Sequence, residues 1–269
     1  MTVKSKIEPI RGRHAIETSV FAFELMEVSE DKIDAFVTKV SEVCNPSTGF
    51  TVVNPLNEVE FKVENGKSNI RHRQIGREFV KPSESGGVDW VISVGAKIVS
   101  CTCFVYDRWA PVKEFSFSYL ERILQSAKTL DVGVNAIALE YQDVFNVRTG
   151  DPREATHSLF NLSSSYLPTN LKNFDGLWHV NQGWFQRFDD CHTVLNILNI
   201  NTQQANDVIT ARIHGVHRIT DNNVLKGVAG FQLDVLSNMN EWFDSLHQQN
   251  KETLRNLLSS EATESISLG

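Results

Sequence analysis

The chain has 269 residues, of which 41% are hydrophobic and 22% charged, and its formal net charge is -7. This composition is typical of a folded globular protein, and the length suits one compact chain with two subdomains. The acidic balance argues against a surface built throughout to coat nucleic acid, because that function needs clustered lysine and arginine. No apolar run approaches the length of a membrane span and the first residues lack the apolar core of a secretory signal, so we expect a cytoplasmic protein.

The first half of the chain begins with a predicted strand, helix and hairpin. Residues 18–28 alternate in the way that a half-buried strand does. Residues 29–44 then carry apolar side chains at helical spacing, and Asn45-Pro46 ends that helix. Asn65-Gly66 supplies the positive backbone angles of a tight turn, so residues 57–70 predict a β-hairpin.

Two further strands and a second helix are expected after the hairpin. Residues 88–95 and 97–106 have an extended pattern. Ser118 and Glu121 form a capping-box signature, which predicts that a helix begins there. Residues 135–147 return to an extended pattern and close the first half.

The second half of the chain repeats this order. Asp151 as the N-cap and Pro152 at the first helical position predict a short helix. A turn at residues 221–223 leads into the last of four expected strands, which lie near residues 178–188, 192–202, 207–220 and 227–236. A final helix is expected after Asn238 and a loose tail at residues 259–269; the helix should bury Phe243, Leu246, Leu254 and Leu257.

The connections between these elements indicate the fold class. Most strands are joined by short turns rather than by helical crossovers, which predicts mainly antiparallel sheets and an α+β fold. Because each half ends with a packed helix, we expect two similar halves: an N-terminal α+β subdomain at residues 1–150 and a C-terminal α+β subdomain at residues 151–269.

A pair of cysteines, Cys101 and Cys103, could suggest a metal or redox site. On a strand both thiols point to the same side as Val99 and Val105, which is typical of a buried sheet face. A structural zinc site also needs a second pair of ligands. The other candidates, Cys191 and His192, are adjacent in the sequence and would point to opposite sides of a strand. We therefore expect free thiols in the core, no metal and no cofactor.

Two segments concentrate positive charge in this acidic chain. One is "RHRQIGR" at residues 71–77, and the other is one face of the strand "ARIHGVHRIT" at residues 211–220, where His214 and His217 point to opposite sides. The candidate polyanion contacts are Arg71, Arg73, Arg77, Arg212, His214 and Arg218. The alternative for each segment is an ordinary solvated strand face.

The two basic segments suit a nucleic-acid- or nucleotide-processing enzyme only if they line one cleft. The sequence contains no GxGxxG, GxSxG or HExxH motif, and we assign no catalytic residue. We therefore favour a non-catalytic binding or assembly protein with a protein partner, or with a second copy of the chain, over an enzyme. Exposed strand edges are one route to such assembly.

Three stretches resemble a functionally unassigned, sporadically distributed prokaryotic family of similar length. The family's signature is similar to one segment of this chain, in which Tyr106, a spacer and Trp109 are followed by a helix and then by the hydrophobic strand "VNAIALEYQDVFN". "HAIETSVFAFEL" resembles its opening strand and "LHQQNKETLRNLLSSEATE" its C-terminal helix with a Leu-His pair, whereas Ala136 stands where that pattern has an arginine. The resemblance implies no catalytic residues. Through the patchy occurrence of the family, it implies an accessory or sensor role in antiphage defence or a mobile element.

Overall fold

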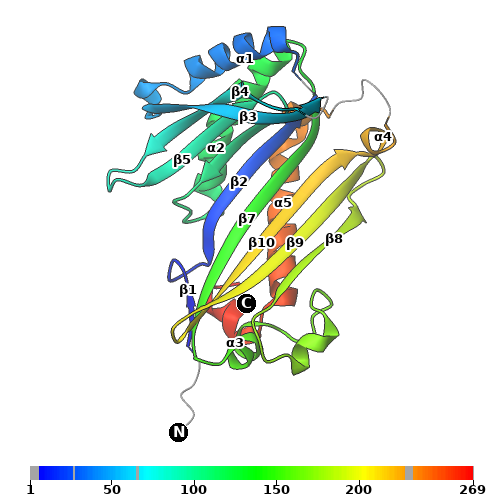
Figure 1. Ribbon diagram of the computed structural model, residues 1–269. Coiled ribbons are helices and arrows are strands. Elements are labelled where there is room, and N and C mark those ends of the chain that lie inside the picture. Colours follow the sequence, from blue (N-terminus) through cyan, green and yellow to red (C-terminus); the bar gives the residue numbers. More distant parts are fainter. Residues whose placement is uncertain (1–5, 27, 65–66, 228–232, 269) are drawn as a thin grey trace. The chain divides into compact units, whose positions relative to one another are not determined.

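The computed structural model describes residues 6–26, 28–64, 67–227 and 233–268 (Figure 1). These residues form an α+β fold around a ten-stranded sheet whose strand pairs are antiparallel, as the sequence predicted. The strands are hydrogen-bonded in the order β3-β4-β5-β6-β2-β7-β10-β9-β8, and β1 (Lys6–Pro9) pairs with β7 outside this path. No helix in the described ranges has the length and apolarity that a membrane span needs.

The chain divides into two compact units. Unit 1 contains Met1–Ser19, Ala138–Thr220 and Asn238–Gly269, and unit 2 contains Val20–Ile137 and Asp221–Ser237. This division differs from the boundary expected between residues 150 and 151. The reason is that β2 (Ile16–Leu25), β7 (Val134–Arg148) and α5 (Val235–Leu257) each contribute residues to both units.

Unit 2 packs two helices on a set of antiparallel strands. Its elements are α1 (Glu30–Val43), η1 (Pro46–Thr48), β3 (Val52–Glu64), β4 (Lys67–Pro82), β5 (Val88–Gly95), β6 (Ile98–Cys103), α2 (Trp109–Thr129) and α4 (Asn222–Leu225). Helix α1 contacts α2, β4 and β5, and α2 contacts β6. Phe36 and Val40 of α1 and Leu120 and Ile123 of α2 are fully buried, as their helical spacing requires. Strands β3 and β4 form the predicted hairpin, whose Asn65-Gly66 turn lies outside the described residues.

Helix α2 begins at Trp109, so the predicted start at Ser118 is wrong. Ser118 lies inside the helix, where its hydroxyl donates a hydrogen bond to the Phe115 carbonyl instead of capping an end. Arg108 is the N-cap and makes no side-chain capping bond. The overlooked signal is Pro111, which fits the first turn because the N–H groups there have no helical partner.

Tyr106 and Trp109, which carry the family resemblance, have packing roles. Tyr106 is buried. The Trp109 ring stacks on Phe21 of β2, with ring centroids 5.5 Å apart and planes inclined by 13°. Phe117, two turns further along α2, meets the same Phe21 ring edge-on. This aromatic cluster fixes the start of α2 against the sheet.

Unit 1 contains the remaining elements. Besides its parts of β1, β2, β7 and α5, these are α3 (Pro152–Leu159), η2 (Thr169–Asn173), β8 (His179–Arg187), β9 (His192–Ala205), β10 (Val208–Asp221, through residue 220) and α6 (Ser260–Ser265). Asp151 caps α3 as predicted, since its carboxylate accepts from the Arg153 and Glu154 N–H groups. One hydrophobic core joins the helices to the strands through Leu159, Leu198, Ile213, Leu257 and Ala262.

Three predictions for the C-terminal part are wrong. The strand expected near residues 227–236 is absent from its described part, since α5 begins at Val235; residues 228–232 lie outside the described residues. The turn expected at residues 221–223 is instead the start of α4, which Asp221 caps by accepting from the Asn223 N–H. The expected loose tail forms α6, because Ser259 caps it and Ala262 is fully buried.

We expect Trp109→Ala to lower the free energy of unfolding by about 3 kcal/mol, because it removes the stacked contact with Phe21 and opens a cavity. Urea denaturation of the variant and the wild type measures this difference. Lys113→Ala is the control, since the Lys113 ammonium lies 5.8 Å from the Trp109 ring and should contribute less than about 1 kcal/mol. Equal stability of Trp109→Ala and the wild type would show that the ring does not anchor α2.

Candidate binding face

Strand β10 divides its side chains between two faces. From residue 208 to residue 219 the even-numbered positions are half-buried and the odd-numbered positions are buried. His214 is therefore half-buried and His217 is buried, 1% exposed. The prediction that these two histidines point to opposite sides is confirmed.

Helix α5 covers the face that carries His217. The His217 Nε2 atom lies 3.3 Å from Asn250 Oδ1, and the Tyr141 hydroxyl lies 2.8 Å from His247 Nδ1. A Cβ atom at Gly215 would stand 3.0 Å from Asn250 Oδ1, so the glycine allows the helix its close approach. Figure 1 shows α5 behind strands β7, β10 and β9.

The other side of these strands, which we call the open face, carries a mixed set of side chains. In the β8–β9 pair, Phe185 lies opposite Leu195 and Gly183 lies opposite Ile197. Phe185 is 65% exposed. The open face includes Phe185, Leu195, Ile197, Arg212, His214, Val216 and Arg218, together with polar residues such as Asn181, Asn199 and Thr210.

Two of the predicted polyanion contacts on the open face lie beside carboxylates. Arg212 Nη1 lies 2.8 Å from Glu17 Oε2 of β2, and His214 Nε2 lies 3.3 Å from Glu140 Oε2 of β7. Arg218 is half-buried on the same side of β10. Strand alternation thus brings Arg212, His214 and Arg218 together, but neighbouring strands add negative charge that the sequence pattern of β10 alone did not reveal.

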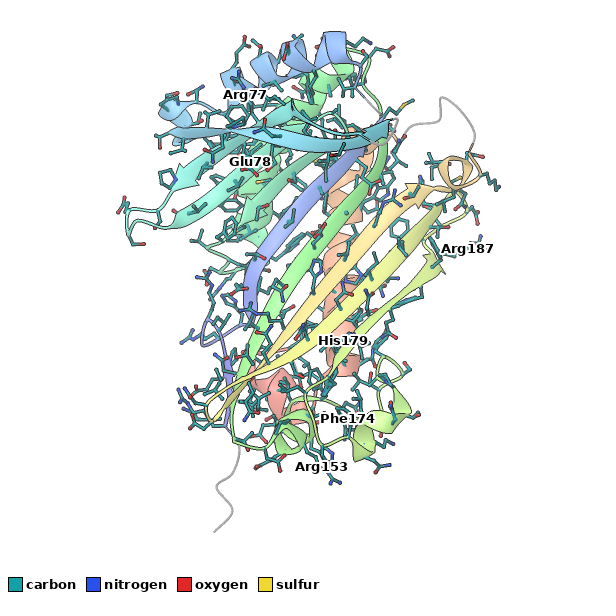
Figure 2. The ribbon with its side chains drawn as sticks, viewed as in Figure 1. Arg77, Glu78, Arg153, Phe174, His179 and Arg187 are labelled. Atoms are coloured by element: carbon teal, nitrogen blue, oxygen red, sulfur yellow. The ribbon has the colours of Figure 1, made fainter. Side chains whose placement is uncertain are left out.

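The other basic segment lies in unit 2, on β4. The side chains of Arg71 and Arg73 lie outside the described residues. Arg77 is exposed, in register with Pro55 of β3 and Val94 of β5 (Figure 2). Next to it, Glu78 accepts a hydrogen bond from the Ser93 hydroxyl at 3.3 Å. That the two basic segments line one cleft stays a prediction of the enzyme hypothesis.

Sequence reasoning missed a buried polar network under α5. His217 Nδ1 lies 2.7 Å from Asn196 Oδ1, and Asn250 contacts the other ring nitrogen. Burial lowers the pKa of His217 to about 4, so the ring is neutral at physiological pH.

Asp143 is 2% exposed, and burial raises its pKa to about 7. A polar residue within an otherwise apolar strand face, as Asp143 is between Tyr141 and Phe145, was the available signal.

The cysteine pair of β6 belongs to the core, as predicted. Cys101 and Cys103 are fully buried, and burial raises the pKa of Cys101 to about 12. A thiol with such a pKa is a poor nucleophile at neutral pH. Val105 does not share their buried face, because β6 ends at Cys103 and Val105 is 41% exposed. Within the described part of the chain, no three His, Cys, Asp or Glu side chains are grouped so that they could hold a metal ion.

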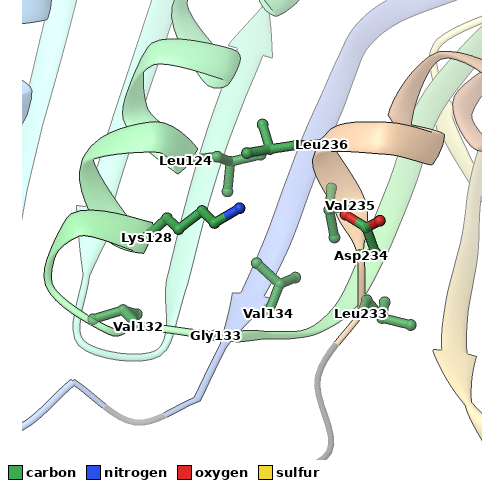
Figure 3. A pocket seen from close by; sticks show the side chains of 9 residues that line it. All are labelled: Leu124, Lys128, Val132, Gly133, Val134, Leu233, Asp234, Val235 and Leu236. Atoms are coloured by element: carbon green, nitrogen blue, oxygen red, sulfur yellow. The ribbon is translucent and has the colours of Figure 1, made fainter.

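Unit 2 also contains a pocket of about 430 Å³ between the end of α2 and the start of α5 (Figure 3). Most of the side chains that line it are apolar, with one amino group from Lys128 and one carboxylate from Asp234; the lining residues are Leu124, Lys128, Val132, Gly133, Val134, Leu233, Asp234, Val235 and Leu236. Such a pocket could hold a small amphipathic molecule. Nothing in its lining selects one, and we assign it no role.

Asp143 and His217 give the free energy of unfolding opposite pH dependences. The pKa of Asp143 is raised from 3.8 to about 7, so the folded state holds the extra proton and stability falls as the pH rises through this range. The pKa of His217 is lowered from 6.5 to about 4, so the unfolded state holds the extra proton and stability rises with pH between these values. The two effects oppose each other where the ranges overlap.

We expect Asp143→Asn to remove the contribution of Asp143, by which the free energy of unfolding falls as the pH rises. The contribution of His217, by which it increases with pH, should remain. The free energy of unfolding of the variant should increase with pH where His217 titrates, and near pH 8 it should exceed that of the wild type by about 4 kcal/mol. Urea denaturation at several pH values between about 4 and 8 measures both profiles. Glu84→Gln, at an exposed carboxylate, is the control. Parallel profiles for Asp143→Asn and the wild type would contradict the prediction.

Comparison with known proteins does not assign this face a role. No protein-family profile matches the chain, and no curated protein has significant similarity to it.

Proposed function

We propose that the chain is a non-catalytic binding protein that docks a protein partner on the open face of unit 1. The observation that carries this proposal is the one-sided coverage of the strands. Helices α3, α5 and α6 share a core with the buried residues of β9 and β10, such as Leu198 and Ile213. The side chains on the opposite side stay accessible on a rigid sheet.

The composition of the open face favours a protein over a polyanion. Apolar side chains such as Leu195, Ile197 and Val216 alternate with the Arg212–Glu17 and His214–Glu140 pairs. Binding of nucleic acid gains its affinity from cations that displace counterions from phosphates, and carboxylates beside these cations reduce that gain. An apolar surface with paired charges suits a protein interface, where the charges set specificity.

The groups with strongly shifted pKa values also fit a binding role. Asp143, His217 and Cys101 are all buried, where a solute cannot reach them. Catalytic groups with shifted pKa values are expected in an accessible cleft instead.

The wider role that we propose rests on the family resemblance. It is an accessory or sensor component of a prokaryotic antiphage defence or mobile-element system that acts in the cytoplasm and assembles with other proteins. We also propose that the chain consists of two similar halves, each of which ends with a packed helix. The alternative, an enzyme that uses a basic cleft on nucleic acid or nucleotides, requires Arg77 and the β10 cations to act on one substrate.

We expect Val216→Glu to abolish partner binding, because it replaces an apolar side chain in the middle of the open face with a carboxylate that an interface would have to desolvate. The tagged wild type and the variant are used as baits in a lysate of the native host, and the captured proteins are compared by quantitative mass spectrometry. The partner recovered with the wild type is then purified. Hydroxyl-radical footprinting of the complex should show protection of Leu195 and Ile197, which lie outside β8.

Val88→Glu, at an exposed valine of unit 2, is the matched control and should retain the partner. Equal recovery of the partner by Val216→Glu and the wild type would overturn the proposal. Salt-sensitive binding of a labelled oligonucleotide by the purified wild type, lost in Arg212→Ala, would favour the alternative function.

A further inference from the structure

Strand β8 ends the sheet in unit 1. It pairs with β9 on one side and is the last strand of the hydrogen-bonded order. In an antiparallel pair, alternate backbone N–H and C=O groups of a terminal strand point away from its neighbour. The nine residues of β8 therefore present an edge about 30 Å long that can accept another strand.

The β8 edge lacks the features that usually protect such edges. The strand contains no proline, lysine, aspartate or glutamate, and its one arginine, Arg187, already pairs with Asp190 in the following turn. Phe185 of this strand is 65% exposed, which makes it the most exposed of the large hydrophobic residues in the described chain. A long edge with an exposed aromatic ring favours strand pairing with another chain.

The opposite edge of the sheet, strand β3 in unit 2, is protected. Pro55 has no backbone N–H and so interrupts the row of hydrogen-bond donors on β3. The register with β4 also shifts between Leu56 and Asn57. Head-to-tail pairing of β8 with β3 of another copy would build an open filament, and the proline and the bulge disfavour it. Pairing of β8 with the same strand of a second copy is closed by two-fold symmetry.

The sequence of β8 suits this antiparallel self-pairing. Gly183 is the central residue of the strand, so full overlap of two copies places Gly183 on the two-fold axis and Phe185 opposite Asn181 of the second copy. Phe185 then also covers the backbone of the second Gly183, which offers no side chain. Inside each copy, Gln182 Nε2 donates to the Tyr166 carbonyl at 2.7 Å and Trp184 stacks on Tyr166, which holds the edge strand in place.

We propose that the chain forms a homodimer by antiparallel pairing of β8 with β8 of a second copy, in the register that joins Phe185 to Asn181. The two copies then form one continuous sheet. Figure 2 labels His179 and Arg187 at the two ends of the strand that makes this contact. The dimer does not depend on which protein the open face binds.

Sedimentation velocity of the full chain tests the pairing. The wild type should sediment as a dimer at micromolar concentration. Phe185→Asp should weaken dimerisation by at least about tenfold, because it removes two buried aromatic rings and adds two carboxylates. Phe174→Asp is the matched control: Phe174 is 44% exposed and lies outside β8, so this variant should remain a dimer.

A second variant tests the register. Phe185→Asp combined with Asn181→Lys places a lysine opposite an aspartate twice across the axis and should restore the dimer. Residues 181 and 185 of one chain are too far apart along a strand to form this pair with each other. Circular dichroism should show that all the variants are folded.

A wild type that stays monomeric up to its solubility limit would overturn the proposal. So would Phe185→Asp that dimerises as tightly as the wild type, or a double variant as weak as Phe185→Asp. Val216→Glu should remain a dimer, so failure of the partner proposal and failure of the dimer proposal are distinguishable.

Discussion

The close approach of α5 to β10 at Gly215 is the contact on which unit 1 depends. The absence of a side chain at Gly215 lets Asn250 lie against the strand, and Asn250 in turn contacts the ring of His217. Strand alternation then sets the direction of the other side chains of β10. Because the odd-numbered side chains face the helix, those of Arg212, His214 and Arg218 point to the opposite side of the strand.

This arrangement places polar groups in the core, and burial shifts the pKa values of Asp143 and His217. Asp143 has an oxygen that is buried without a hydrogen-bond partner among the described residues, so it is most stable in its protonated form. His217 is most stable as the neutral ring because burial disfavours the charge, and this effect outweighs the contact with the Asn250 oxygen, which acts in the opposite direction. Asn196, His217 and Asn250 thus form a polar network between the sheet and α5 that contains no buried ion pair.

Local patterns in the sequence predicted most of the elements, because their signals are short-range. The cap at Asp151, the stop at Asn45-Pro46 and the alternation of β10 each depend on a few neighbouring residues. The start of α2 was misplaced because Ser118 and Glu121 imitate a cap and Pro111 was overlooked, and the packing of Trp109 on Phe21, which no local pattern reveals, stabilises the earlier start.

The candidate site was only partly predictable, because its character depends on contacts between distant segments. The alignment of Arg212 with His214 follows from strand periodicity alone. Their partners Glu17 and Glu140 come from strands that are 195 and 74 residues away in the chain. No local pattern reveals such pairing, and so the face could appear basic in the sequence although its charges are matched in the structure.

The two edges of the sheet show how assembly and binding would act together. Strand β3 carries its own protection in Pro55 and a bulge, whereas β8 carries Phe185 and no such feature. In the proposed self-pairing, directly opposed residues lie on the same side, so the open faces of the two copies would be neighbours on one side of a continuous sheet. A partner with two equivalent docking sites would then gain from simultaneous engagement, and weak contacts at each open face would suffice for tight binding.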